Sequence, residues 1–196
     1  DFTTGLYATD PLHNTDPRCL QLWKEAGALD FTDFIHARHV ELRVGGFFVG
    51  VFACPKRSNG DYPWSQVGRP IYDALLKKVQ SPDVLASCIL PVCWRTEEDV
   101  RNGFDLDQWT IHAIEFHETK DPVRESYERN ELTAIQYGRS VIDSFKAVGH
   151  RTCLEALSQN IPGGIDEANP LLEEAYDDAV EVVASDPNKY NLDVSF

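Results

Sequence analysis

A predicted strand followed closely by a long predicted helix is the feature that most constrains the fold of this chain. Apolar and polar residues alternate over 108–118, which is typical of a strand with two distinct faces. Asp121 and Pro122 then form a start signal for a helix, and apolar residues recur at helical spacing over 122–148. Both faces of the predicted strand carry apolar residues, so we expect neighbours to cover it on both sides.

A second strand-like region lies upstream and carries a pair of glycines. Residues 39–53 are rich in valine and phenylalanine, and Gly45-Gly46 can supply the positive φ angles of a two-residue turn. This predicts a hairpin with strands at 39–44 and 47–53, although one long bent strand with a glycine bulge fits the same pattern. We therefore predict an α+β fold: a small antiparallel or mixed sheet with the long helix packed across it.

The two ends of the chain differ in composition from its middle. Asp16-Pro17 predicts a short helix that ends at Gly27, and breakers before it predict an extended arm. We expect Gly149 to close the long helix, with helical and strongly acidic sequence after it. This predicts an N-terminal arm and short helix (1–30), an α+β core domain (31–150) and an acidic helical appendage (151–196).

The charge and the cysteines exclude several classes of protein. The net charge is −14, which argues against direct binding to nucleic acid or to an anionic membrane surface. No apolar run reaches the roughly 18 residues that a membrane span needs. The five cysteines are scattered and odd in number, so we expect no disulfide framework and a reducing compartment, either the cytoplasm or a virion assembled there.

Three polar residues of the predicted strand are weak candidates for a metal site. They are His112, Glu115 and His117, of which Glu115 and His117 would share one face of the strand while His112 points away. The His-Glu-x-x-His signature of helical zinc sites does not occur here. A polar surface or interface role is therefore favoured, and we expect no cofactor.

Two other groupings of reactive residues are looser. His36 and His39 follow two aspartates, Asp30 and Asp33, and His-x-x-His can bind a metal on a helix turn, but here the pair spans a predicted loop-to-strand boundary. A nucleophilic pair could join Cys88 or Cys93 to a histidine of the predicted strand. Buried structural thiols are the more common case, and no local signature supports an active one.

Large aromatic residues are the candidates for a protein interface. Such residues anchor interfaces when they lie at the surface, and they pack in the core when they do not. Both alternatives stay open for this set: Trp64, Trp94, Trp109 and Phe116.

The segment from Asp107 to the long helix resembles a known family. The order Asp107-x-Trp109, an alternating strand to Glu118, then Asp121 and a long helix is similar to the middle of the tail-terminator and related neck proteins of tailed phages. The resemblance spans roughly 40 residues, and the chain departs from that family's pattern after Gly149, where the family returns to strands. It implies a non-enzymatic ring subunit of a virion, built from a small α/β domain with extended arms.

These observations favour a non-enzymatic structural subunit of a larger assembly, either a homo-oligomer or a hetero-assembly with other protein subunits. The support is the combination of an extended arm, a long loop and a doubly apolar strand with no recognisable catalytic constellation. Two alternatives remain: a small metal-dependent hydrolase that uses His112, Glu115 and His117, and an acidic inhibitor or immunity-type protein that binds a basic partner.

Overall fold

The chain folds mainly into helices, and the predicted α+β fold with a central sheet is wrong. The structure is a computed structural model that describes residues 6–8, 10, 16–55, 65–190, 192 and 194–195. Its elements, in chain order, are α1 (Pro17–Glu41), α2 (Ser65–Val79), α3 (Pro82–Leu85), η1 (Ala86–Cys88), α4 (Glu97–Asn102), β1 (Glu118–Thr119), α5 (Pro122–Glu128), α6 (Ala134–Asn160), α7 (Gly164–Ser185) and β2 (Val194–Ser195).

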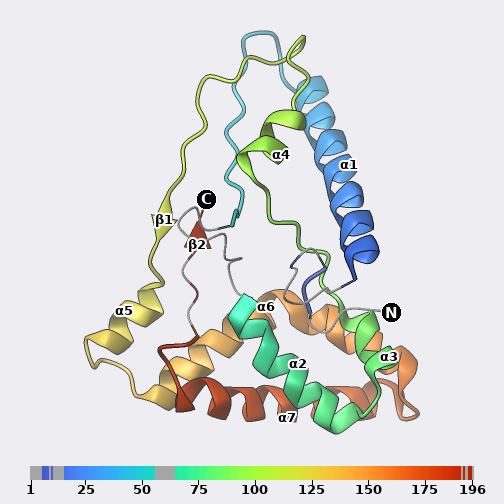
Figure 1. The fold of residues 1–196 in the computed structure, drawn as a ribbon, viewed down its shortest axis with the longest axis vertical. Coiled ribbons are helices and arrows are strands. Elements are labelled where there is room, and N and C mark those ends of the chain that lie inside the picture. Colours follow the sequence, from blue (N-terminus) through green and yellow to red (C-terminus); the bar gives the residue numbers. More distant parts are fainter. Residues whose placement is uncertain are drawn as a thin grey trace.

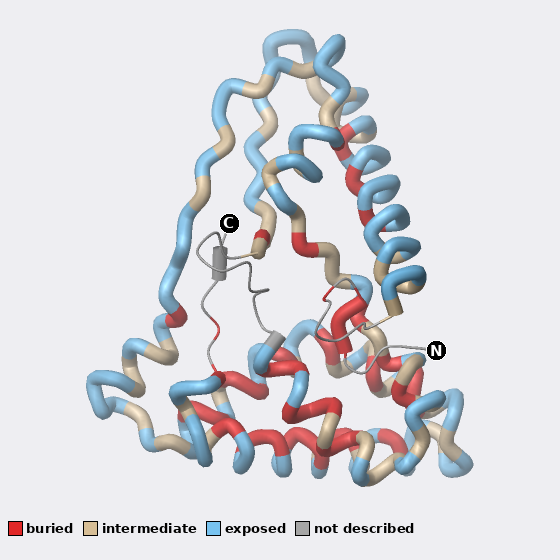
Figure 2. Tube along the Cα trace, viewed as in Figure 1, coloured by how far each residue is buried: buried red, intermediate tan, exposed pale blue. Residues whose placement is uncertain are grey.

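The helices divide into two parts with different degrees of burial. The base consists of α2, α3, α5, α6 and α7, and it holds most of the buried residues (Figures 1 and 2). The lobe consists of α1, residues 42–55, α4 and residues 103–117, and it rises from the base to an apex at which two extended segments turn (Figure 1). Most residues of the lobe are exposed (Figure 2).

The base is organised around the antiparallel pair of α6 and α7. A tight turn at 161–163 joins the two helices, and Gly164 begins α7 with a φ of +58°. Gly138 of α6 lies so close to α7 that a Cβ there would be 2.8 Å from the carbonyl oxygen of Val180. The missing side chain therefore lets the two helix backbones approach closely, and α2 packs against the same pair.

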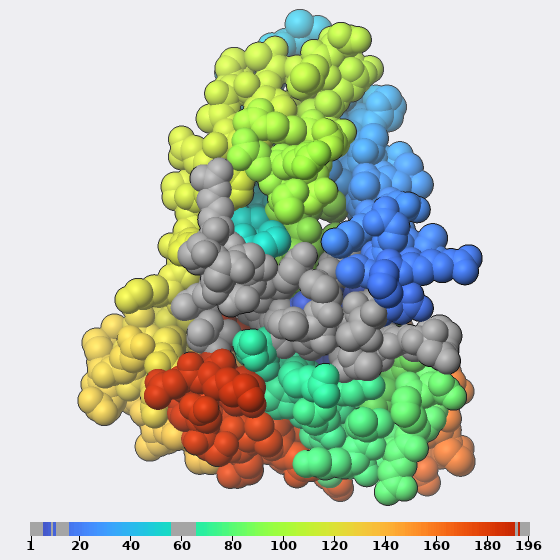
Figure 3. Space-filling model, in the orientation of Figure 1, coloured from blue at the N-terminus to red at the C-terminus, as the bar shows by residue number. Residues whose placement is uncertain are grey.

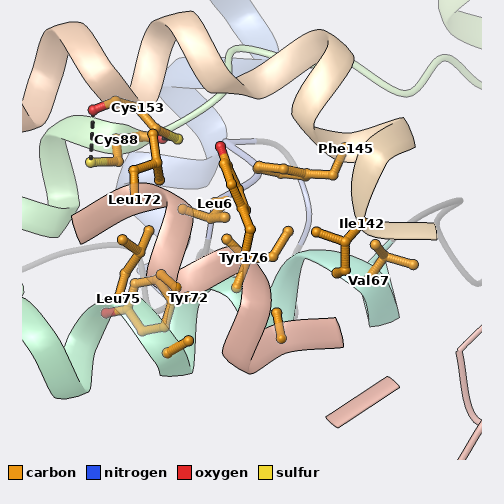
Figure 4. Close-up of a cluster of buried hydrophobic side chains, with 14 of the residues drawn as sticks. Leu6, Val67, Tyr72, Leu75, Cys88, Ile142, Phe145, Cys153, Leu172 and Tyr176 are labelled. Atoms are coloured by element: carbon orange, nitrogen blue, oxygen red, sulfur yellow. Dashed lines mark hydrogen bonds between the residues drawn. The ribbon is translucent and has the colours of Figure 1, made fainter. Parts of the chain in front are cut away.

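Two cysteines lie in the middle of this core. Cys88 of η1 and Cys153 of α6 are fully buried beside Leu172 and Tyr176 of α7 (Figure 4). The sulfur of Cys153 lies 3.8 Å from the carbonyl oxygen of Cys88, and the reverse contact measures 4.0 Å. All five cysteines are free thiols, and these two pack as small apolar side chains.

The predicted long helix over 122–148 is two helices. Asp121 caps α5 as its position before Pro122 predicts, but the chain leaves the helix at Arg129, and Asn130 adopts a φ of +58°. Thr133 then caps α6 through a capping box with Gln136. Apolar residues keep a helical spacing on both sides of this break. Their spacing alone therefore does not show that the helix is interrupted there.

Gly149 does not close this helix as predicted, because α6 continues through it to Asn160. A Cβ on Gly149 would lie 2.8 Å from the ring of Phe145 and 3.2 Å from Leu90. Gly27 behaves alike in α1, where a Cβ would lie 2.3 Å from the sulfur of Cys93, and α1 continues to Glu41. Both glycines make room for a neighbour, and neither ends its helix.

The predicted cap of α1 is confirmed, since Asp16 accepts hydrogen bonds from the amides of Arg18 and Cys19.

The predicted strands do not pair with one another. Residues 39–41 belong to α1, and residues 47–53 and 110–117 are extended without a ladder between them. Within the described ranges, the sheet is limited to an antiparallel pair in which Glu118 lies opposite Ser195 and Thr119 opposite Val194. A separate parallel bridge joins Tyr7 to Leu90. The alternating pattern correctly indicates extended backbone, but no strand among the described residues pairs with it before Glu118.

The acidic sequence after residue 150 forms part of the base. The predicted boundary at 150/151 falls inside α6, and α7 supplies buried residues to the shared core. Basic side chains of α2 and α6 pair with the acidic face of α7, as in Lys78–Asp178 at 3.0 Å and Arg139–Asp177 at 2.6 Å. The acidic residues are therefore partly neutralised within the chain.

The last described residues fold back onto the base. The hydroxyl of Tyr137 on α6 donates a hydrogen bond to the carbonyl oxygen of Tyr190, and its ring lies 5.1 Å from that of Tyr127. Arg124 of α5 donates to the carbonyl oxygen of Pro187 and to Asn188, the latter at 2.6 Å. These contacts fix the C-terminal segment across α5 and α6.

Two buried tyrosines predict a loss of stability at alkaline pH. Burial raises the pKa of Tyr7 and of Tyr176 far above the ordinary value near 10. The folded chain therefore keeps phenolic protons that the unfolded chain releases, so stability is level below about pH 10 and falls above it, by up to about 1.4 kcal/mol per pH unit per tyrosine. Urea unfolding at pH 9 and pH 11 measures this slope. The free energy of unfolding of Tyr176→Phe should fall less steeply with pH than that of the wild type. Equal slopes would contradict a contribution from the buried hydroxyl of Tyr176.

Candidate functional site

The lobe is held together by a cluster of aromatic rings instead of a layered core. The ring centroid of Phe31 lies 5.1 Å from that of Phe52 and 6.1 Å from that of Phe104, both in edge-to-face contact. Trp109 lies 5.5 Å from Phe104 and 6.2 Å from Phe48. These rings come from α1, from residues 42–55 and from residues 103–117, so the aromatic cluster joins all three segments.

Cations and small residues complete the aromatic cluster. The guanidinium of Arg95 lies 4.3 Å from the centre of the Phe31 ring and donates a hydrogen bond to the carbonyl oxygen of Gly27. The Phe31 ring is also close to Gly103, where a Cβ would lie 2.3 Å from Cδ1. Phe31 is buried as a result, although most of the lobe is exposed.

Residues 47–52 have the side-chain alternation of a strand. Phe48 and Phe52 point inward to the aromatic cluster, with Gly50 between their rings. A Cβ at Gly50 would lie 2.5 Å from Phe52 and 3.1 Å from Phe48, so a side chain there would displace a ring. The alternate residues point outward and form what we call the outer row: Phe47, Val49 and Val51, which are 78%, 87% and 72% exposed.

The backbone of this segment is as open as its outer row. Among the residues that the structure describes, none forms a hydrogen bond with the backbone of residues 47–52. The nearest backbone bonds are the turn from Gly46 to Arg43 at 2.8 Å and the bond from Arg95 to Ala53 at 3.2 Å. Residues 47–52 therefore present unpaired amides and carbonyls together with an apolar face, which is what a strand of another chain would need.

Exposed apolar residues gather around the same apex. Val44 is fully exposed at the turn, where Gly45 has a φ of +79°, and Leu106 is exposed on the neighbouring segment. In the space-filling view, the apex is formed by residues near 45–50 and near 100–110 (Figure 3). Contiguous exposed apolar surface beyond a few hundred Å² is unusual on a monomer and marks interaction sites.

The predicted interface residues are distributed between the core and the lobe. Trp94 is buried, with its ring 6.2 Å from that of Tyr7, so it packs inside the subunit. Trp109 is half-buried within the aromatic cluster, and Phe116 is half-buried on the extended segment below it. Trp64 lies outside the described residues.

The candidate metal ligands lie on an exposed extended segment. Nε2 of His117 is 3.4 Å from a carboxylate oxygen of Glu115, and both side chains are largely exposed. His112 instead lies beside Phe47, with 6.4 Å between the ring centroids. Across the described ranges, no three His, Cys, Asp or Glu side chains gather as a metal site would require.

Of the two looser groupings, the histidines of one lie on a single helix, and the cysteines and histidines of the other are separated. His36 and His39 both lie in α1, not at a loop boundary, and His39 packs 5.8 Å from the ring of Trp109. Cys88 is buried in the base against Cys153, whereas His112 and His117 lie in the lobe. Cys93 faces Gly27, and burial raises the pKa of its thiol, which disfavours the reactive thiolate.

The outer row is the feature that sequence reasoning missed. Residues 47–53 look like an internal strand of a sheet because both of their faces are apolar. In the structure, the inner face is covered by the aromatic cluster and the outer face is open. The signal was present in the sequence as a run of 12 uncharged residues, 44–55, in a strongly charged chain.

Comparison with known proteins adds no relative. A scan against protein-family models gives no match, and a search of curated proteins gives none either. In the described part of the chain, no helix is both long enough and apolar enough to span a lipid bilayer.

Proposed function

We propose that the chain is a non-enzymatic structural subunit that joins a larger protein assembly through the apex of its lobe. The observation that supports this most strongly is the outer row, an apolar face beside a backbone segment with open hydrogen-bonding groups. Burying three such side chains stabilises an interface by about 1.5–3 kcal/mol each, before the cost of association is subtracted. The aromatic cluster fixes residues 47–52 within the lobe and thereby keeps the outer row facing outward.

The alternatives receive less support from the arrangement of side chains. A metal-dependent hydrolase would need His112, Glu115 and His117 to converge, and His112 lies beside Phe47 instead. An acidic inhibitor would present free carboxylates to a basic partner, whereas several carboxylates of α7 pair with Lys78, Arg139 and Lys146. A ring of a phage neck or tail is one form that the proposed assembly could take, and ring-shaped particles in electron micrographs would support that form.

The experiment is native mass spectrometry of the purified chain over a range of concentrations. We expect a defined oligomer for the wild type and a loss of that oligomer for the double variant Phe47→Asp/Val49→Asp, because carboxylates cannot be buried unpaired at the interface. The control is Val182→Asp, which places one carboxylate on an exposed apolar position of α7. The control should keep the oligomer, and all three proteins should have the same circular dichroism.

Two results would contradict the proposal. The first is a double variant that assembles to the wild-type mass. The second is a monomeric wild type in which the amides of 47–52 resist hydrogen exchange, since protected amides would mean that the lobe already satisfies its own backbone.

A further inference from the structure

The outer row has the chemistry of one half of a symmetric interface. Phe47, Val49 and Val51 project from the same side of residues 47–52, and Val49 is the middle residue of the three. A strand that pairs with this segment in antiparallel orientation must supply apolar side chains at the matching alternate positions. The same segment of a second copy supplies them: a two-fold axis at Val49 places Phe47 opposite the partner subunit's Val51.

The charge distribution favours a second copy at this place over other partners. Residues 17–55 contain four basic and four acidic residues, and residues 44–55 contain no charge. The largest acidic excess lies in residues 118–190, which include α5, α6 and α7 and contain 15 acidic and seven basic residues. Residues 97–117 of the lobe add six acidic residues and one basic residue. A charged partner would find no complementary charge on the outer row.

The shape of the molecule reduces the electrostatic objection to self-association. A chain with a net charge of −14 repels its copies when their acidic faces meet. The apex of the lobe lies at the end of the molecule opposite α6 and α7 (Figures 1 and 3). Pairing apex to apex keeps the two acidic bases apart, by far more than the Debye length of about 8 Å at physiological salt.

We infer that residues 47–52 of two copies pair as antiparallel strands around a two-fold axis at Val49. This inference rests on the proposed function and names the partner of the same surface. The paired strands satisfy the amides and carbonyls on the facing edges of both copies, and the two outer rows join into one apolar face. The aromatic clusters of the two copies cover the opposite face of the paired strands.

The register makes a sharp prediction for disulfide cross-linking. Residues directly opposite in an antiparallel pair have Cα atoms about 4.5–5.5 Å apart, which is within the range of a disulfide. Val49→Cys places the new thiol opposite its own copy. Phe47→Cys places the two thiols four residues out of register, roughly 13 Å apart along the strands, which is too far to join.

The experiment treats each full-length variant with a glutathione redox buffer and separates the products by non-reducing electrophoresis. We expect most of the Val49→Cys protein to run at twice the monomer mass and to return to it with reductant. Phe47→Cys alone should stay at the background of the wild type, which controls for the five native thiols. An equimolar mixture of Phe47→Cys and Val51→Cys should give dimers again, because these positions face each other.

The outcomes separate this inference from the proposed function. If Val49→Cys and Phe47→Cys cross-link equally, or if neither exceeds the wild type, the two-fold strand pairing is overturned. If the cross-linking fails in either of these ways but Phe47→Asp/Val49→Asp still loses the wild-type oligomer, the lobe carries assembly and only the strand pairing is wrong. A wild type that stays monomeric at every concentration overturns the second copy as the partner.

Discussion

Replacing Tyr137 by alanine is expected to remove about 3–5 kcal/mol of the free energy of unfolding. Tyr137 is fully buried in α6, where its ring packs on Tyr127 and lies 5.8 Å from the guanidinium of Arg124. Its hydroxyl also donates to the carbonyl oxygen of Tyr190. The truncation leaves a cavity where α5, α6 and the C-terminal segment meet. A loss of this size is a large share of the roughly 5–15 kcal/mol that stabilises most domains.

Urea unfolding followed by circular dichroism measures this loss as a shift of the midpoint. The matched control is Tyr137→Phe, which keeps the ring and removes only the hydrogen bond, so it should cost about 1 kcal/mol. A difference of several kcal/mol between the two variants would show that the packing of the ring is the larger contribution. If both variants unfold at the wild-type midpoint, the described packing of α5 and the C-terminal segment on α6 is wrong.

Replacing Phe31 by alanine is expected to unfold the lobe while the base stays folded. Phe31 contacts Phe52, Phe104 and Arg95, which lie on three different segments, and its loss should cost about 3–5 kcal/mol in a buried setting. The lobe has few other buried residues, so its local stability is small relative to that of the base. The outer row loses its support in this variant, so assembly should be lost as well.

Limited proteolysis and native mass spectrometry together test this expectation. Phe31→Ala should be cut within 42–55 and 103–117, while α6 and α7 resist cleavage. The control is Leu29→Ala on the same helix, because Leu29 is exposed and should cost no more than about 1 kcal/mol. A Phe31→Ala protein that resists proteolysis and still forms the wild-type oligomer would show that the aromatic cluster does not support the lobe.

Local signals in the sequence determined where most helices begin. Asp16 before Pro17 and Asp121 before Pro122 each accept backbone hydrogen bonds at the start of a helix, as predicted. Ser81 before Pro82 does the same for α3, and the breaker at 161–164 separates α6 from α7. These signals are reliable because a cap satisfies amides only two or three residues away, so no distant part of the chain is involved.

Several of the places where prediction failed depend on a distant neighbour. Gly27 and Gly149 could end a helix by their conformational freedom, but Cys93 and Leu90 occupy the space beside them, and both helices continue. The extended segment 108–118 has the alternation of a central strand, yet the described residues beside it supply no ladder before Glu118. Alternating apolar and polar residues are compatible both with a strand paired in a sheet and with an extended segment that has no hydrogen-bonded partner.

The sequence by itself determined the starts of α1, α3 and α5, the turn at Gly45, the extended character of 47–53 and the uncharged run from 44 to 55. Only the tertiary structure decided that α7 lies in the core and that Phe48 and Phe52 turn inward while Phe47, Val49 and Val51 stay open. The physical reason is that hydrogen bonds within a turn or cap are local, whereas the burial of a face depends on which segment folds against it.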